Sequence, residues 1–197
     1  MPEAMPTMTP APTVWDMGVD EERDDTEERD DTEERVDIVD EHDNVLRTVT
    51  RAEMRRDRLR HRGVFIAVIT SRNELVIHQR SPLKDIWPSY WDIGAGGVVA
   101  SGETYEESAE RELLEELGIE AALLPLGGSY YEDGEVALFG RGFAALHDGP
   151  YQFRDGEVSA IELVTLEKFD TLLWARPWCP DSIALALPLI RAHMNNL

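Results

Sequence analysis

The chain has one cysteine and no long apolar run among its 197 residues. Because Cys179 is alone, an internal disulfide is excluded, and we expect a small buried thiol in a reducing compartment. The apolar runs are far shorter than the ~18 to 20 residues of a membrane-spanning helix. The N-terminal residues show neither the basic region nor the apolar region of a secretion signal. These absences predict a cytoplasmic protein with no membrane partner.

Positive charge is also scarce, with 19 Lys and Arg against 40 Asp and Glu, a net charge of −21. A chain this acidic lacks the clustered cations that bind phosphate backbones, so we expect no nucleic-acid partner. Residues 1 to 35 hold 13 acidic and 3 basic side chains, a net charge of −10, and include the repeat EERDDTEERDDTEER. We expect this tail to be disordered and solubilising, because the repeat has no apolar residue to bury and proline-rich sequence precedes it. The alternative is an interaction arm for a basic partner.

From residue 36 the pattern changes to short strand-like segments separated by turns, with 42% hydrophobic residues in the chain as a whole. We interpret residues 36 to 197 as one domain. A hairpin is expected around Asp43-Asn44, and residues 81 to 97 are expected to be a long aromatic loop. Strands and helices alternate without a repeating βαβ rhythm, which predicts an α/β (α+β) fold with a mixed β-sheet sandwiched between helices. The expected helices cover residues 51 to 59, 104 to 117 and 180 to 194; the expected strands cover residues 64 to 70, 74 to 80, 122 to 131, 135 to 146 and 159 to 166.

The segment GVVASGETYEESAERELLEELGI, residues 97 to 119, contains the clearest local signals. Thr104 followed by Glu107 is a capping box, and Gly118 follows the last leucine as a helix stop. At about 100° per residue, the leucines form one side of this helix, and Glu112, Glu115 and Glu116 share a neighbouring arc. Three carboxylates are therefore expected on one patch.

These carboxylates repel one another, and Arg111 is the sole cation that the helix sequence contains. We expect the compensating positive charge to come from outside the helix. Mg²⁺ suits this requirement, because it is a hard cation that binds carboxylates, water and substrate phosphates. The alternative interpretation is a solvated charged helix face.

The spacing of these residues resembles the Nudix box at every position. The resemblance covers roughly residues 36 to 195 and implies a Nudix fold and hydrolysis of a diphosphate that is linked to another group. It implies Mg²⁺, with Mn²⁺ as an alternative, and a small-molecule diphosphate as the partner. The residues that carry it are Gly97, Glu103, Arg111, Glu112, Leu113, Glu115, Glu116, Gly118 and Ile119.

The resemblance also implies roles for individual residues. The metal ligands are Glu112, Glu115 and Glu116, together with the Gly96 carbonyl and a further acid from a distal loop, Glu157. Glu112 or Glu115 is the base that accepts the proton of the attacking water. Gly97 allows close approach of the substrate, and Arg111 is expected to orient Glu103 or a box carboxylate.

A narrower resemblance, in RHRGVFIAV, QRSPLKDIWPSYWDIGAGG and CPDS, is to the Nudix branch of type 1 isopentenyl-diphosphate isomerase. The catalytic cysteine and a metal-binding histidine of that branch correspond to Gly96 and Val98, so both are missing. The diphosphate-contacting positions correspond to Arg80 and Lys84. Trp91 is interpreted either as a pocket floor or as part of the core.

The resemblance leaves alternatives open. A hydrolase is favoured over a non-catalytic module that binds a diphosphate, because all three box glutamates are present. An isomerase is the third interpretation. Substrate identity is not predicted, because variable loops build the discriminating pocket, and a homodimer stays open as the oligomeric state.

Overall fold

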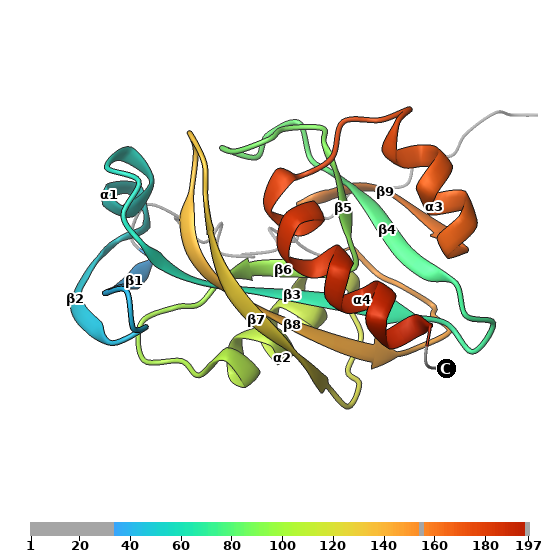
Figure 1. Ribbon diagram of the computed structural model, residues 1–197, viewed down its shortest axis with the longest axis horizontal. Helices are drawn as coiled ribbons and strands as arrows, with labels where there is room; N and C mark the ends of the chain where they lie inside the picture. Colours follow the sequence, from blue (N-terminus) through green and yellow to red (C-terminus); the bar gives the residue numbers. More distant parts are fainter. Residues whose placement is uncertain (1–33, 154–155, 196–197) are drawn as a thin grey trace, which may run out of the picture.

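The computed structural model describes residues 34–153 and 156–195, and most of the expected tail lies outside them. Strands and short helices alternate along the described chain (Figure 1). The strands are β1 (Arg35–Val39), β2 (Val45–Thr50), β3 (His61–Ile69), β4 (Leu75–Arg80), β5 (Trp91–Ile93), β6 (Ala95–Val98), β7 (Leu124–Glu132), β8 (Ala137–Leu146) and β9 (Val158–Val164). The helices are α1 (Arg51–Arg56), α2 (Tyr105–Leu117), α3 (Leu166–Leu173), the π-helical turn η1 (Ser182–Ala186) and α4 (Leu187–Met194).

Strands β1 and β2 form the expected hairpin, and the other seven strands form one mixed sheet. Strands β3 and β8 are parallel, and the remaining pairs are antiparallel. Strands β3 and β4 pair at Ile69 and Leu75 and then diverge. Strand β6 therefore pairs with β3, whereas β5 pairs with β4. This divergence opens the sheet at the end where β5 and β6 lie.

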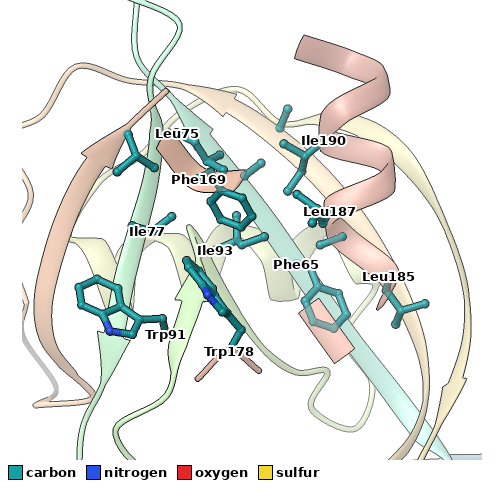
Figure 2. Packing of buried hydrophobic residues seen from close by; sticks show 14 of the residues in the cluster. Phe65, Leu75, Ile77, Trp91, Ile93, Phe169, Trp178, Leu185, Leu187 and Ile190 are labelled. Atoms are coloured by element: carbon teal, nitrogen blue, oxygen red, sulfur yellow. The ribbon is translucent and has the colours of Figure 1, made fainter. Parts of the chain in front are cut away.

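Strand β3 separates two hydrophobic cores because its side chains alternate between the faces of the sheet. Phe65 and Ile69 pack with the C-terminal helices (Figure 2). Val64, Ile66 and Val68 pack with α2 on the opposite face. The sheet is therefore covered by α2 on one face and by α3 and α4 on the other, which is the expected fold class (Figure 1). In the described part of the chain, no helix is long and apolar enough to cross a membrane.

Three expectations about local structure are corrected. Helix α1 ends at Arg56 rather than at residue 59, and the expected loop of residues 81 to 97 contains β5 and β6. These two strands have three and four residues, which is too short for a periodic pattern to appear in the sequence. Helix α3 was not expected, because its first turn directly follows the apolar residues of β9.

Candidate active site

Helix α2 has the predicted start and end. The Thr104 side chain accepts a hydrogen bond from the Glu107 backbone N–H at 3.1 Å, and the Glu107 carboxylate accepts one from the Thr104 N–H at 2.8 Å. Gly118 ends the helix with a φ of 65°, the left-handed conformation that glycine adopts at low cost. Because Ala109, Leu113 and Leu117 are buried in the core, the rotation of the helix is fixed. That rotation directs Glu112 and Glu116 toward β6.

Arg111 connects the acidic side chains of this helix. Its Nε and Nη2 donate to the two oxygens of Glu103, each at 2.9 Å. Its Nη1 donates to Glu112 Oε1 at 2.7 Å and to Glu115 Oε2 at 3.0 Å. Arg111 therefore orients both Glu103 and the box carboxylates. Arg111 therefore neutralises part of the negative charge within the helix, and the expectation of a further cation from outside stays a prediction.

Glu112 and Glu116 are buried, with 7% and 1% of their surface exposed. Burial raises the pKa of Glu112 to about 7, against the lowering effect of Arg111. Burial, together with the neighbouring Glu112 carboxylate, raises the pKa of Glu116 well above its usual value. Glu116 Oε2 accepts a hydrogen bond from the Gly96 backbone N–H at 3.0 Å. The two carboxyl groups are thus held together where a second negative charge is unfavourable without a proton or a cation.

Strand β6 requires glycine at positions 96 and 97, because neighbouring atoms lie too close to leave room for a side chain. A Cβ on Gly97 would lie 2.1 Å from Glu112 Oε1, and a Cβ on Gly96 would lie 2.6 Å from the Val64 carbonyl oxygen. The space above Gly97 therefore holds the Glu112 carboxylate. At Gly96 the described contact to the box comes from the N–H, whereas the prediction concerned its carbonyl.

The predicted distal acid reaches the box. Glu157 lies close enough to Glu112 and Glu116 to raise the pKa of each, although burial is the larger cause. Its carboxylate forms an ion pair with Lys84 Nζ, and its carbonyl accepts a hydrogen bond from the Ser81 N–H at 2.7 Å. The structure therefore brings Lys84, which was predicted to bind substrate, beside the carboxylate patch.

Arg80 is surrounded by polar groups, whereas Trp91 lies in the hydrophobic core. Arg80 Nη2 donates to the Ile86 carbonyl at 3.1 Å, and its Nη1 lies 3.9 Å from Asp92 Oδ2. Trp91 is buried in the core on the face of the sheet that packs with the C-terminal helices, near Trp178 (Figure 2). The core interpretation of Trp91 is therefore favoured over a pocket floor.

The surroundings of Arg80 include buried polar residues that the sequence analysis missed. Asp92 accepts a hydrogen bond from the Ser182 hydroxyl, and burial raises the pKa of Asp181 to about 7. On β4, His78 Nδ1 lies 2.8 Å from the Gly94 carbonyl oxygen. Cys179 is buried as expected, and burial raises the pKa of its thiol. The residues of this cluster come from β4, β5 and the start of η1, so no single segment contained a signal for it.

The carboxylate patch fits a hard metal ion in its donor chemistry. Glu112 and Glu116 offer buried carboxylate oxygens, and their raised pKa values mean that a cation would stabilise the charged forms. Within residues 34–153 and 156–195, no group of three acidic, histidine or cysteine side chains already has the arrangement of a metal site. Arg111 Nη1 donates to one oxygen of Glu112 and to one oxygen of Glu115, so it contacts two of the predicted ligands directly.

Comparisons with known proteins agree with this geometry. The NUDIX domain family matches residues 59–184. An uncharacterised Nudix hydrolase of Pseudomonas aeruginosa is 38% identical over 146 residues, which cover 74% of this chain and 86% of that protein. The uncharacterised Nudix hydrolase YfcD of Escherichia coli K12 is 35% identical over 161 residues, which cover 81% of this chain and 88% of YfcD.

Solved structures show the same fold. The crystal structure of DR0079 from Deinococcus radiodurans superimposes with a TM-score of 0.66 at 30% identity, covering 81% of this chain and 98% of DR0079. The NUDIX domain of Shewanella oneidensis NrtR, solved with ADP ribose, has a TM-score of 0.53 at 19% identity, covering 67% of this chain and 86% of that one. This chain therefore belongs to the Nudix family, and it is a hydrolase of pyrophosphate bonds.

Proposed function

We propose that this enzyme cleaves the diphosphate linkage of a small organic molecule with Mg²⁺, or alternatively Mn²⁺, as cofactor. The observation that carries the proposal is the pair of buried carboxylates, Glu112 and Glu116, beside Arg111. A non-catalytic module has no need to keep two carboxylates buried together at this cost. Family membership supports the same conclusion.

The proposed ligands for the metal are Glu112, Glu115 and Glu116, with Glu157 and the Gly96 carbonyl as further donors. When bound, Mg²⁺ supplies positive charge that stabilises the negative charge developing on the phosphates. Lys84 pairs with Glu157, and Arg80 is within electrostatic range of Glu116. Both cations are proposed to bind the diphosphate oxygens. Trp91 is no longer proposed as a substrate contact, because its ring lies in the core.

In the proposed reaction a water oxygen attacks one phosphorus in line, and the bond from that phosphorus to the bridging oxygen breaks. Glu112 or Glu115 accepts the proton of the water. Arg111 holds both carboxylates through a single nitrogen, so it orients whichever of them serves as base. Both products leave as phosphates, and no co-reactant other than water is consumed.

The resemblance to the isopentenyl-diphosphate isomerase branch concerns a reaction that needs a proton donor and a proton acceptor around a carbon skeleton. Gly96 has no side chain where that branch has its thiol, and Cys179 is buried with a raised pKa. Hydrolysis needs only water, a metal and a carboxylate base. We therefore propose hydrolysis and keep isomerisation as the alternative to be tested.

A chromatographic screen for the two phosphate-bearing cleavage products, with Mg²⁺ present, tests the proposal. The substrates are nucleotide sugars including ADP ribose, dinucleotides, coenzyme A esters, oxidised nucleotides and prenyl diphosphates. We expect cleavage of at least one class, about 10²-fold slower in Glu112→Gln and unchanged in Glu110→Gln, an exposed glutamate of the same helix. Formation of dimethylallyl diphosphate from isopentenyl diphosphate without phosphate release would instead support the isomerase.

A further inference from the structure

The segment of residues 84 to 86 gathers three cations. Lys84 belongs to the segment itself. Arg55, on α1, places its Nε 3.3 Å from Asp85 Oδ2, and Arg80, on β4, donates from Nη2 to the Ile86 carbonyl at 3.1 Å. Because Asp85 and Ile86 are consecutive residues, and Arg80 is close enough to lower the pKa of Arg55, although burial is the larger cause, the two guanidinium groups lie in the same neighbourhood.

Both guanidinium groups are largely buried, but not all of their N–H donors have hydrogen-bond acceptors. Their side chains are 21% and 13% exposed, and the Nε of each has no hydrogen-bond acceptor among the described residues. The contact of Arg55 with Asp85 is thus an ion pair without hydrogen-bond geometry. The 3.9 Å between Arg80 and Asp92 exceeds the ~2.7 to 2.9 Å of a charge-assisted hydrogen bond.

Among the described residues, the acidic side chains around the two arginines accept no hydrogen bond from the Nε of Arg55 or of Arg80. One oxygen of Asp92 accepts from the Ser182 hydroxyl, and Asp181 is within electrostatic range of both arginines. Burial lowers the pKa of Arg55 to about 10 despite Asp85, and the nearby Arg51 and Arg80 lower it further. An anion bound between the guanidinium groups would relieve this repulsion and satisfy the free Nε donors.

The cation cluster continues from the carboxylate patch. Lys84 pairs with Glu157 and is close enough to Glu116 to lower its pKa, although burial and Glu112 outweigh this effect. Burial lowers the pKa of Arg80, but nearby negative charges, including those of Asp92 and Glu116, raise it. From the box outward, the order of charges is therefore Glu116, then Lys84 and Arg80, then Arg55.

We propose that Arg55, together with Arg80, which is shared with the neighbouring diphosphate, forms an anion subsite that binds a phosphate group of the substrate beyond the two phosphates flanking the scissile bond. The forks of the two guanidinium groups match the oxygens of a tetrahedral phosphate, which accepts several hydrogen bonds at once. Because the subsite is continuous with Lys84, this extra phosphate follows the diphosphate directly. The inference rests on the proposed function and narrows its substrate class.

Binding of two inorganic anions tests the subsite without turnover. Inorganic pyrophosphate and inorganic tripolyphosphate are titrated into the full-length protein by calorimetry, in EDTA and again with the metal present. The parent is expected to bind tripolyphosphate more tightly. Arg55→Gln is expected to weaken tripolyphosphate binding by about tenfold and pyrophosphate binding by less than about twofold, because one charged donor pair is lost at the third phosphate alone.

The matched control is Arg56→Gln, which removes the same charge from the next residue of α1. Arg56 is 68% exposed and pairs with Asp57 at 2.7 Å, so we expect no selective effect. Equal losses of tripolyphosphate affinity in Arg55→Gln and Arg56→Gln would show that the effect comes from the net charge of the protein alone. That result would overturn the subsite. An equal loss for both anions in Arg55→Gln would also overturn it.

Two further variants separate binding from loop positioning. If Arg55 acts only by holding the loop, Asp85→Asn should reproduce the loss seen in Arg55→Gln; we expect instead that Asp85→Asn retains or strengthens tripolyphosphate binding. Arg55→Lys keeps the charge without the fork, and its tripolyphosphate affinity should lie between those of the parent and Arg55→Gln. Selective tripolyphosphate binding in a protein that hydrolyses nothing in the substrate screen would reject the proposed function while supporting the subsite.

Discussion

The carboxylate of Glu112 occupies the place of the missing side chain of Gly97. A Cβ on Gly97 would lie 2.1 Å from Oε1 and 2.5 Å from Oε2 of this glutamate. The glycine therefore positions a proposed catalytic group from a strand to which that group does not belong.

Gly97→Ala should displace the Glu112 carboxylate and lower kcat/KM by about 10²-fold, since a shift of ~1 Å in a reacting group costs about this much. The overlap should also reduce the free energy of unfolding by about 1 to 3 kcal/mol. Steady-state kinetics and urea denaturation measure the two effects. Gly134→Ala is the control, because no atom lies within 4 Å of an added Cβ there. Similar kinetics in both variants would contradict the assignment.

Arg111→Gln should destabilise the protein in the absence of metal, because the variant leaves Glu112 buried without its cation. We expect a loss of about 1 to 3 kcal/mol in urea denaturation, a range reduced because the Arg111 side chain is partly exposed. The control is Arg72→Gln, whose ion pair with Glu74 involves a side chain that is 70% exposed. There the expected loss is below ~1 kcal/mol, and equal losses would show that Arg111 has no special role.

Glu112→Gln should lower kcat by about 10² or more with a smaller change in KM, the usual scale of lost general-base catalysis. Glu115→Gln, measured alongside it, identifies the base. The variant with the larger fall in kcat, and with the loss of the corresponding limb of the pH–rate profile, carries the proton-accepting group. A fall of less than about threefold in both variants would exclude both residues as the base.

Mg²⁺ or Mn²⁺ should raise the unfolding temperature, because a metal that binds the folded carboxylate patch stabilises the native state by mass action. In Glu116→Gln this shift should shrink strongly. Differential scanning fluorimetry with and without metal measures it, and Glu106→Gln, an exposed residue of the same helix, should keep the parental shift. An unchanged shift in Glu116→Gln would show that Glu116 is not a ligand.

The stability advantage of the metal-free parent over Glu112→Gln should decrease as the pH rises from about 5 to 8. Burial raises the folded-state pKa of Glu112 to about 7 from its ordinary value of 4.5, so between these values the folded state binds more protons than the unfolded state. Stability from this group is thus present at low pH and lost as the pH rises through about 7. The expected size is on the order of 1 to 3 kcal/mol.

The parent must be compared with Glu112→Gln, because buried histidines change the free energy of unfolding with pH in the opposite direction. Burial lowers the pKa of His61 to about 3, so its contribution to stability is lost as the pH falls below its usual value. This contribution is the same in the parent and the variant and cancels in their difference. Chemical denaturation in EDTA at several pH values measures the difference, which also includes Glu116, because Glu112 contributes to its raised pKa after burial. A constant difference would mean that the pair does not titrate in this range.

The sequence alone determined the features that depend on residues three or four positions apart. The capping box, the Gly118 stop and the shared face of the box glutamates follow from helix geometry, and the structure has all of them. The spacing of the box also identified the family, which the comparisons confirmed. These features need no information about distant segments.

The tertiary structure decided which side chains meet. The sequence indicated Arg111 as an orienting residue, but only the packing of α2 against β6 shows one nitrogen shared by Glu112 and Glu115. The strands β5 and β6 were too short to show a period, so the face on which Trp91 packs was left open. The meeting of Arg55 with Asp85 joins α1 to a distant loop. Such contacts join segments that are far apart in the chain and are set by tertiary packing, so no local pattern of residues encodes them.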